Sequence, residues 1–498
     1  MNGRLRLLAA TAALGVAATA TLTVGCNRTP PPADEPPVAP VAVIPVDDST
    51  KPADDSKHII TTPADVKMVT AVTPKPLSEA VKKGLVYLAE TQQADGGWNQ
   101  GGGWRTGDKG NGRVEGKEVA DPSDVGNTAF ALLAFLRAGH TATAGEYKDV
   151  VGKGLAFLCK QVSAADGDSL YVTDVRNTQL QSKIGTYVDT FMATLVLTEF
   201  KGLAGEHEQA VAAARDKSLD KIANHQTEKG EFAGNTGWAS NLSWGIANKA
   251  LSRAKMSGAK VNEQLLTRAT TGVRAQAATG PWADAKATPG FGGGPGFGSA
   301  RGGFGGGAGG GAPADRVGGS DAGVGLYGQS QSAANLRDSR NAVQGDLNKA
   351  REVLKKESAS KEEKEKAAAV VDEAKKADKL AADGEAQLGK SIRDKGFVAG
   401  FGSNGGEEFL SFLNISETLL VKAGDDWTEW NNQMQEAIPK AQDKDGSWSG
   451  KHCITGKTFC TSAALLVLLA DRTPFPADVL ADARAVKADV KTESKEKK

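Results

Sequence analysis

Two carboxylates of this 498-residue chain stand where acid–base chemistry could be carried out, each near the start of an apolar segment. Asp124 belongs to the segment 123–138, and Asp189 belongs to the segment 185–200. Such a pair can act as general acid and general base if the fold brings the two side chains together. Asp124 could equally cap a helix, because carboxylates are favoured at the positive N-terminal end of a helix. Both interpretations are open for this pair.

Other side chains near the starts of the apolar segments could contact a ligand. Trp238 and Trp244 could stack on a sugar ring or contact an isoprenoid. If the segment starts converge on one mouth, these two residues would lie there with several polar neighbours. The candidates for ligand contact at this mouth are Asn127, Tyr187, Trp238, Trp244, Glu407 and Glu408.

Cysteines offer a second kind of chemistry. Cys453 and Cys460 are close in sequence, and in an exported chain they could form a disulfide or remain buried thiols. His452 beside them raises the alternative of a metal site, but the histidines of the chain are otherwise far apart. Cys159 lies in an apolar helical pattern and is typical of a small core residue. We expect no metal and no cofactor.

One spacing recurs along the chain: a glutamine, a glycine four residues later and an aromatic residue six residues later. Each copy follows an amphipathic helical pattern. The glycine can adopt the positive φ that a helix C-terminus favours, and the glutamine amide can bond free backbone groups there. The aromatic ring can then cover the turn, so these residues predict a structural role. The copies are Gln92–Gly96–Trp98, Gln226–Gly230–Phe232, Gln276–Gly280–Trp282 and Gln442–Gly446–Trp448.

A more apolar helical pattern follows most copies, and alternating strand patterns are almost absent. Helices that are apolar nearly all round are buried, whereas amphipathic helices expose one face. We therefore expect an all-α fold in which amphipathic helices form an outer layer and apolar helices form an inner layer. The predicted apolar segments are 123–138, 185–200, 241–251, 321–336, 407–421 and 459–470.

The repeat resembles that of the terpenoid cyclase and protein prenyltransferase superfamily, including its prenyltransferase and squalene oxidase repeat proteins. The first copy carries the resemblance, with Lys83-Gly84, Tyr87-Leu88 and then Gln92, Gly96 and Trp98. The last copy, QDKDGSWSG, is similar. The resemblance covers roughly residues 77–283 and 397–472. It implies an α/α toroid of helical hairpins with an inner and an outer ring, and it marks the scaffold more than any chemistry.

The catalytic residues of that superfamily do not appear at the matching places. An Asp-x-Asp-Asp tetrad, which cyclases use to protonate their substrate, is absent from the sequence. Aromatic residues, which stabilise cationic intermediates, make up only 6% of the chain. The position of the late zinc-ligand histidine of prenyltransferases is occupied by Cys460 or a neighbour. The sequence therefore favours a non-catalytic protein over an enzyme.

The N-terminus indicates export. Arg4 and Arg6 precede an uncharged run from residue 7 to residue 24, and the run ends before Cys26. This pattern resembles a bacterial lipoprotein signal, which implies lipidation at Cys26 and a place in the cell envelope facing the periplasm. The alternatives are a plain secretory signal or a single anchoring helix. Residues 27–76 then predict a Pro-rich disordered tether.

The remaining chain divides by composition. The toroid repeats would occupy 77–283 and 397–472. A Gly-rich loop with a degenerate repeat would occupy 284–336, and a charged helical insertion, as an exposed hairpin or short coiled coil, would occupy 337–396. A charged tail would follow at 473–498.

The charge balance bears on partners. Basic and acidic residues number 60 each, which argues against a nucleic-acid binder. Three functions remain open. The first is non-catalytic binding of an isoprenoid, another lipid or a protein partner at the envelope. The second is an enzyme of the cyclase, prenyltransferase or glycan-cleaving type that uses the mouth carboxylates. The third is a purely structural envelope scaffold.

Overall fold

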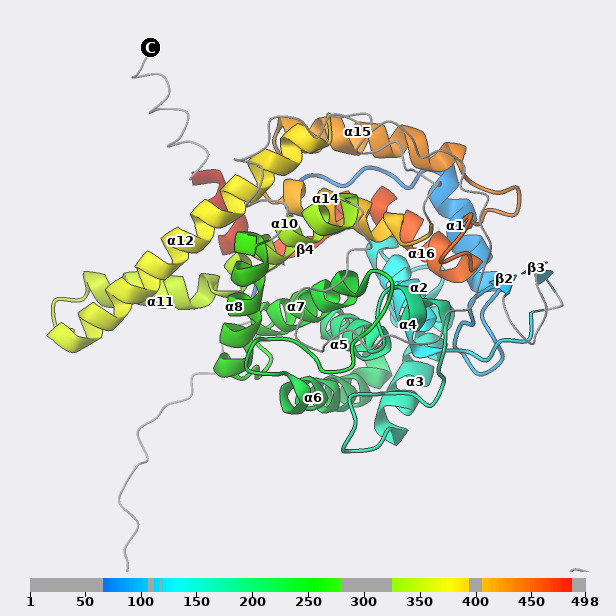
Figure 1. Ribbon diagram of the computed structural model, residues 1–498, viewed down its shortest axis with the longest axis horizontal. Coiled ribbons are helices and arrows are strands. Elements are labelled where there is room, and N and C mark those ends of the chain that lie inside the picture. The colour runs from blue at the N-terminus through cyan, green and yellow to red at the C-terminus, as the bar shows by residue number, and fades with distance from the viewer. Residues whose placement is uncertain (1–65, 106–111, 117–118, 280–324, 394–404, 486–498) are drawn as a thin grey trace, which may run out of the picture. The chain divides into compact units, whose positions relative to one another are not determined.

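The computed structural model describes residues 66–105, 112–116, 119–279, 325–393 and 405–485. The chain separates into two units, and the first, Met1–Thr61, lies wholly outside the described residues. The description below concerns the second unit, Thr62–Lys498. Its described part is mostly helical with a few short strands, which confirms the predicted all-α class (Figure 1).

A set of apolar helices forms the core of the described residues. Residues on all sides of each helix are buried, as expected for helices that are apolar nearly all round. Each helix of the set contacts two others, in the order α2–α5–α7–α10–α14–α16, and α16 contacts α2. The apolar helices are α2 (Val125–Ala138), α5 (Val188–Glu199), α7 (Ser240–Met256), α10 (Gly325–Ala342), α14 (Glu408–Leu420) and α16 (Lys457–Leu468).

Amphipathic helices pack against this set, each with one buried face. In α1 (Glu79–Glu90), Val81, Leu85 and Leu88 recur at helical spacing and are buried, and the Ser78 side chain caps the helix start. α1 contacts α16 and α2, α8 contacts α7 and α10, and α15 contacts α14 and α16. The others are α3 (Lys148–Ala164), α6 (Glu208–His225), α8 (Glu263–Thr279), α12 (Lys361–Ser391) and α15 (Asp425–Lys440).

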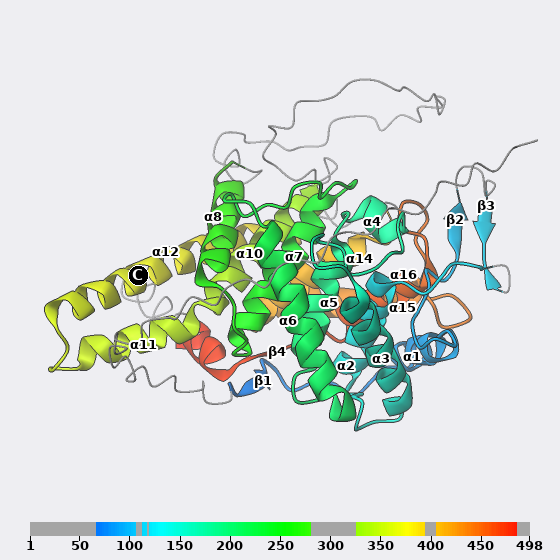
Figure 2. The ribbon, with the colours of Figure 1, turned by 90° about the horizontal axis from the view of Figure 1, so that it is seen from below.

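Short strands lie at the two ends of the helices (Figure 2). β2 (Gly103–Arg105) and β3 (Gly112–Val114) form an antiparallel hairpin near the start of α16, where Thr458 N donates to Gln100 O. β1 (Met68–Thr70) pairs antiparallel with β4 (Pro474–Pro476), which follows the end of α16. The short helix α4 (Gln179–Lys183) lies just before α5.

The described part of the charged segment 337–396 begins within α10 and contains two whole helices, α11 (Gln344–Lys355) and α12. α10 continues through residue 337 to Ala342, and α11 then packs against α12. The last turns of α12 also contact α10, where Arg337 and Lys422 form ion pairs with Glu385. α11 and the first half of α12 extend away from the other helices in Figure 1 as a helical hairpin, whereas the last turns of α12 pack against α10.

The recurring turns have the local geometry that the sequence predicts. Gly96, Gly230 and Gly446 have φ values of 87°, 83° and 85°. Trp98 Nε1 donates to the Leu88 carbonyl at 2.7 Å, so the indole covers the end of the preceding helix. Gln276 lies within α8, but its side chain and the positions Gly280 and Trp282 lie outside the described residues.

The glutamines of the first and last turns, Gln92 and Gln442, also join one repeat to the next, whereas the Gln226 amide makes no hydrogen bond among the described residues. Gln92 Nε2 donates to Gly96 O at 2.8 Å and to Val150 O, at the start of α3, at 2.9 Å. In the same way Gln442 Nε2 donates to Gly446 O at 2.8 Å and to Ala80 O, in α1, at 2.8 Å. In these two turns the glutamine therefore satisfies one carbonyl in its own turn and one on the neighbouring amphipathic helix.

Candidate functional site: the N-terminal ends of the apolar helices

The predicted carboxylate pair lies between the starts of α2 and α5. Asp124 is the N-cap of α2, and its carboxylate accepts from Asn127 N at 2.8 Å and from Asn127 Nδ2 at 2.9 Å. Asp189 accepts from Gly126 N at 2.7 Å and from Gln181 Nε2 at 2.6 Å. Both carboxylates therefore satisfy backbone N–H groups in the first turn of α2, and Asp189 ties α5 to α2.

Both carboxylates are closed to solvent. Asp124 is 1% exposed and Asp189 is 2% exposed. Burial, followed by the nearby charge of Asp189, raises the pKa of Asp124 to about 8, and burial also raises the pKa of Asp189. The pair therefore retains a proton at neutral pH. A raised pKa can mark an acid–base site, but a substrate could not reach this pair without opening the helix starts.

The other predicted mouth residues differ in exposure. Asn127 is buried against Asp124, and Trp244 is buried with its Nε1 donating to Gly230 O at 2.9 Å. Trp244 therefore packs on a repeat turn. Tyr187 donates through its hydroxyl to Ala233 O at 3.1 Å and is partly exposed. Trp238 is 50% exposed, so of these four residues it presents the largest aromatic surface to solvent.

A second exposed tryptophan, which the repeat pattern did not single out, lies nearby. Trp104, on β2, is 50% exposed, and its backbone N donates to Thr455 Oγ1 at 2.8 Å. Gln179, at the start of α4, donates through Nε2 to Trp104 O at 3.4 Å. Ser182, in the same short helix, accepts from Trp238 N at 3.3 Å. The helix α4 thus contacts the backbone of both exposed tryptophans. We call Trp104, α4 and Trp238 the tryptophan rim.

Glu407 and Glu408 are buried at the start of α14. Glu407 Oε2 accepts from Ile454 N at 3.4 Å, and burial raises the pKa of the Glu407 carboxyl. Tyr327, near the start of α10, is buried too. Burial, followed by the charges of Glu407 and Glu408, raises the pKa of its hydroxyl. These acids are internal groups of the helix starts and do not form an open acidic surface.

The three cysteines of the described residues are free thiols. Cys460 Sγ donates to Ile454 O at 3.6 Å, and Cys453 Sγ lies 3.3 Å from His452 Nδ1, so the predicted alternative of a Cys453–Cys460 disulfide is not formed. Burial raises the pKa of Cys453 to about 11 and that of Cys460 to about 12, which keeps both protonated at neutral pH. Within the described ranges, no group of three His, Cys, Asp or Glu residues is arranged to hold a metal ion.

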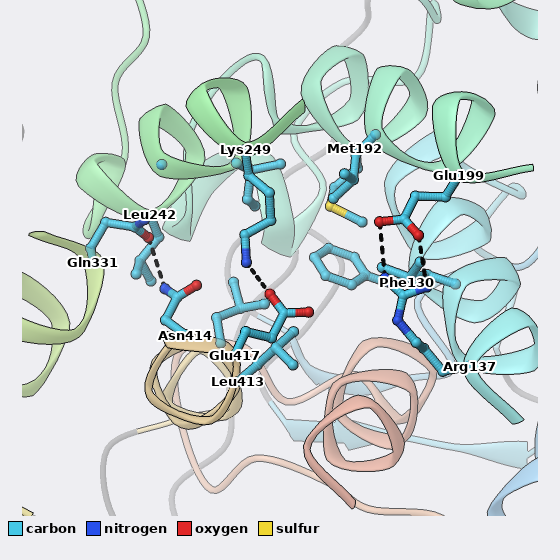
Figure 3. Close-up of a pocket in the computed structure, with 15 residues that line it drawn as sticks. Phe130, Arg137, Met192, Glu199, Leu242, Lys249, Gln331, Leu413, Asn414 and Glu417 are labelled. Atoms are coloured by element: carbon cyan, nitrogen blue, oxygen red, sulfur yellow. Dashed lines mark hydrogen bonds and ion pairs between the residues drawn. The ribbon is translucent and has the colours of Figure 1, made fainter. Parts of the chain in front are cut away.

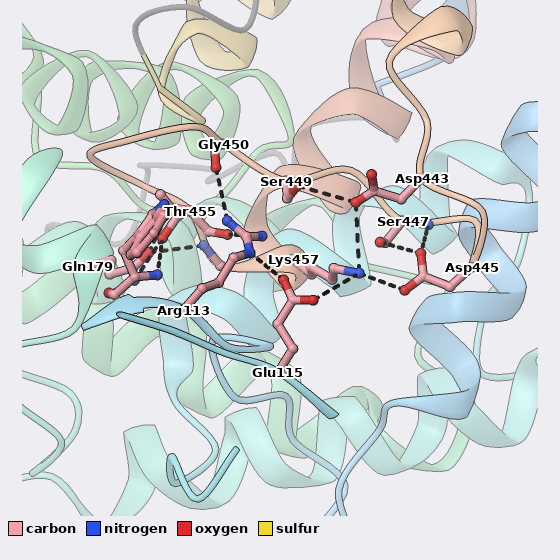
Figure 4. Close-up of polar contacts among 12 residues, drawn as sticks. Arg113, Glu115, Gln179, Asp443, Asp445, Ser447, Ser449, Gly450, Thr455 and Lys457 are labelled. Carbon is pink, nitrogen blue, oxygen red and sulfur yellow. Dashed lines mark hydrogen bonds and ion pairs between the residues drawn. The ribbon is translucent and has the colours of Figure 1, made fainter. Parts of the chain in front are cut away.

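Polar contacts join the last repeat turn to the β2–β3 hairpin (Figure 4). Lys457 Nζ lies 2.7 Å from Asp445 Oδ2, 3.7 Å from Asp443 Oδ2 and 3.8 Å from Glu115 Oε2. On the other side of the hairpin, Gln179 Oε1 accepts from the backbone N of Thr455 at 2.9 Å. These contacts hold the loop before α16 against the tryptophan rim.

The cavity enclosed by the apolar helices is small, and Figure 3 shows residues that line it. The cavity there has a volume of about 30 Å³, which holds about two water molecules. Its walls come from α2, α5, α7, α10 and α14. Apolar lining residues include Phe130, Leu133, Met192, Leu242 and Leu413.

Buried ion pairs occupy the remainder of this space. Arg137 binds both carboxylate oxygens of Glu199, at 2.8 and 2.9 Å, and Lys249 Nζ contacts Glu417 Oε2. Burial alone would raise the pKa of Glu417, but Lys249, Arg253 and Arg137 outweigh it and lower the pKa to about 2. The interior is therefore charged and paired at neutral pH.

No family model, curated protein or solved structure matches this chain. No helix among the described residues is long and apolar enough to cross a membrane. Cys26, the predicted lipidation site, lies outside those residues. The assignment of function therefore depends on the geometry of the helices and of the tryptophan rim.

Proposed function

We propose that this chain is a non-catalytic α/α toroid that binds a protein partner at the bacterial cell envelope. Three features support a ring of helical hairpins. The apolar helices contact one another in a series that returns from α16 to α2. The amphipathic helices pack against that series. The last repeat turn bonds to the first amphipathic helix through Gln442 and Ala80.

The filled interior is the main observation in support of a non-catalytic function. A site for an isoprenoid or another small molecule has a volume on the order of 300–1,000 Å³. The central cavity, of about 30 Å³, is an order of magnitude smaller. The carboxylate pair Asp124–Asp189 is buried as well, which argues against a glycan-cleaving site. These findings weigh against the central isoprenoid site that the sequence left open.

The tryptophan rim is the surface that we assign to the partner. Tryptophan is enriched among residues that dominate the binding energy of protein interfaces. Trp104 and Trp238 each expose half of their surface, and both are anchored through their backbone to α4. A partner that covers both rings would bury apolar surface on a support that is already ordered.

The envelope location rests on the sequence. The uncharged run before Cys26 and the Pro-rich sequence that follows it support an exported chain held to the membrane by a lipid and a tether, although the predicted tether 27–76 is too long, because Met68–Thr70 form β1. Such an arrangement would leave the helical unit free to present the tryptophan rim to another envelope protein.

Site-directed photo-crosslinking tests this proposal. A photoreactive phenylalanine analogue would replace Trp104 or Trp238 in the full chain, with Leu380 on the exposed face of α12 as the matched control position. We expect one discrete crosslinked protein from positions 104 and 238 and none from position 380. Equal crosslinking at all three positions would contradict the partner surface. An isoprenoid that co-purifies at one per chain in native mass spectrometry, and still does so in Leu203→Asp, would contradict the filled interior.

A further inference from the structure

A groove lies at the opposite end of the helices from the tryptophan rim. It has a volume of about 740 Å³ and is bordered by the C-terminal ends of α5 and α7, by the segment after α5, and by β1 and β4. This volume is within the range of sites that enclose small molecules. The groove is therefore the larger candidate binding space, in contrast to the central cavity.

One wall of the groove is apolar and open to solvent. Met68 is 38% exposed and Leu203 is 40% exposed, and Val66 is exposed to a similar degree. Pro474 of β4 lies in the same wall. Single exposed apolar residues are common on protein surfaces, but several that line one groove indicate a binding surface for an apolar group.

The opposite part of the groove carries cationic donors that are not fully used. Arg253 is only 3% exposed; its Nη1 donates to Pro474 O, and its Nε makes no hydrogen bond. That Nε lies 3.7 Å from Glu199 Oε1, beyond hydrogen-bond distance. Lys201 Nζ donates to Ser257 O at 2.8 Å, and an ammonium group has two further donors. Ser257 directly follows the helix that contains Arg253, so both cations lie at the end of α7.

The acidic groups of the groove, in contrast, already have partners. Both oxygens of Glu199 accept from Arg137. Glu208 accepts from Gly202 N at 2.7 Å and from Ala204 N at 3.3 Å. The polar donor that remains open to the groove is the Lys201 ammonium group, which fits an anion. The Arg253 guanidinium is buried beneath the groove, so an anion bound to Lys201 would also gain from the nearby positive charge of Arg253.

We infer that this groove binds a free fatty acid. The carboxylate would accept from Lys201 Nζ, close to the charge of the buried Arg253, and the hydrocarbon chain would lie along Val66, Met68, Leu203 and Pro474. One end of the groove supplies charge and the other supplies apolar surface, which matches a molecule with a single anionic head and an apolar tail. This inference does not depend on the proposed partner surface, because the two surfaces share no residue.

Isothermal titration of the full chain with sodium oleate tests the inference. We expect saturable binding of one oleate per chain with a dissociation constant in the micromolar range. Leu203→Asp should weaken binding at least tenfold, because it places a second negative charge where the chain of the ligand would lie. Leu203 is exposed, so the variant should retain its fold, as circular dichroism would show. Leu380→Asp, at an exposed leucine of α12, is the matched control and should bind as the parent does.

A comparison of two ligands tests the role of the cations. Oleyl alcohol has the same apolar chain without the carboxylate, and we expect it to bind at least tenfold more weakly than oleate. Lys201→Gln should reduce that difference. The inference would be overturned by an absence of saturable oleate binding, by equal affinities of Leu203→Asp and Leu380→Asp, or by equal affinities of oleate and oleyl alcohol. The inference would also be overturned if the parent does not bind oleate but floats with phosphatidylglycerol vesicles, and Leu203→Asp abolishes this flotation. That result would assign the groove to a membrane surface.

Discussion

Gln442 donates through Nε2 to the carbonyl of Ala80, at 2.8 Å and across 362 residues of sequence. This bond repeats the geometry of Gln92 and Val150, which joins the first repeat turn to the next amphipathic helix. The same side-chain chemistry therefore joins the first repeat turn to the next repeat and joins the last repeat turn to the first amphipathic helix.

Replacement of Gln442 by alanine should destabilise the described unit. The variant Gln442→Ala leaves two carbonyls, of Gly446 and Ala80, without this donor. Loss of these bonds should lower the free energy of unfolding by about 1–3 kcal/mol, as urea unfolding would measure. Gln226→Ala is the matched control, because the Gln226 amide makes no hydrogen bond among the described residues and should cost less. Equal losses in the two variants would contradict a closing role for Gln442.

Close approach at Gly446 gives a second test of repeat docking. Gly446 has a φ of 85°, and a Cβ there would lie 2.6 Å from the Lys83 carbonyl oxygen of α1. Gly139 has a φ of 96°, but its surroundings are open within 4 Å. Gly139→Ala should therefore cost about 1–2 kcal/mol from backbone strain alone. Gly446→Ala should cost measurably more in urea unfolding, and an equal cost would show that α1 yields without penalty.

The free energy of unfolding should fall as the pH rises from about 4 to about 8, because of Asp124. Burial raises the pKa of Asp124 to about 8, so the folded chain holds a proton that the unfolded chain has released above its ordinary pKa near 4. A folded state that binds more protons loses stability as pH rises. Asp124→Asn should reduce this dependence, because asparagine also caps helices and does not ionise, while the raised pKa of Asp189 remains.

The measurement is the free energy of unfolding at pH 5 and pH 8.5. The parent should lose at least about 1 kcal/mol between these values, and Asp124→Asn should lose clearly less. Asp220→Asn, at an exposed position of α6, should follow the parent. A pH dependence that Asp124→Asn leaves unchanged would show that the buried pair does not hold the proton.

The parts of the structure that follow from local chemistry were predictable from sequence. The turn at Gln92, Gly96 and Trp98 depends on residues within a few positions of one another, and the Asp124 cap depends on the adjacent helix start. Trp104 could not be predicted as part of the rim, because it lies on a hairpin outside the repeat pattern. Lys249 belongs to a helix that the apolar pattern predicts, and its partner Glu417 is 168 residues away. Pairs at such separation depend on the packing of whole helices, which a periodic pattern does not specify.

The last prediction concerns the ion pairs of the filled interior. Glu417→Gln should leave the buried Lys249 charge without its closest partner and destabilise the unit by about 3–5 kcal/mol. The double variant Lys249→Met with Glu417→Leu removes both charges and keeps a similar volume. Because burying two charges is costly, this double variant should be close to the parent in stability. Urea unfolding of both proteins makes the comparison, with Lys440→Met and Glu436→Leu at an exposed pair of α15 as the control. A double variant as unstable as Glu417→Gln would mean that the space needs polar groups or water, and would contradict a centre closed by packing.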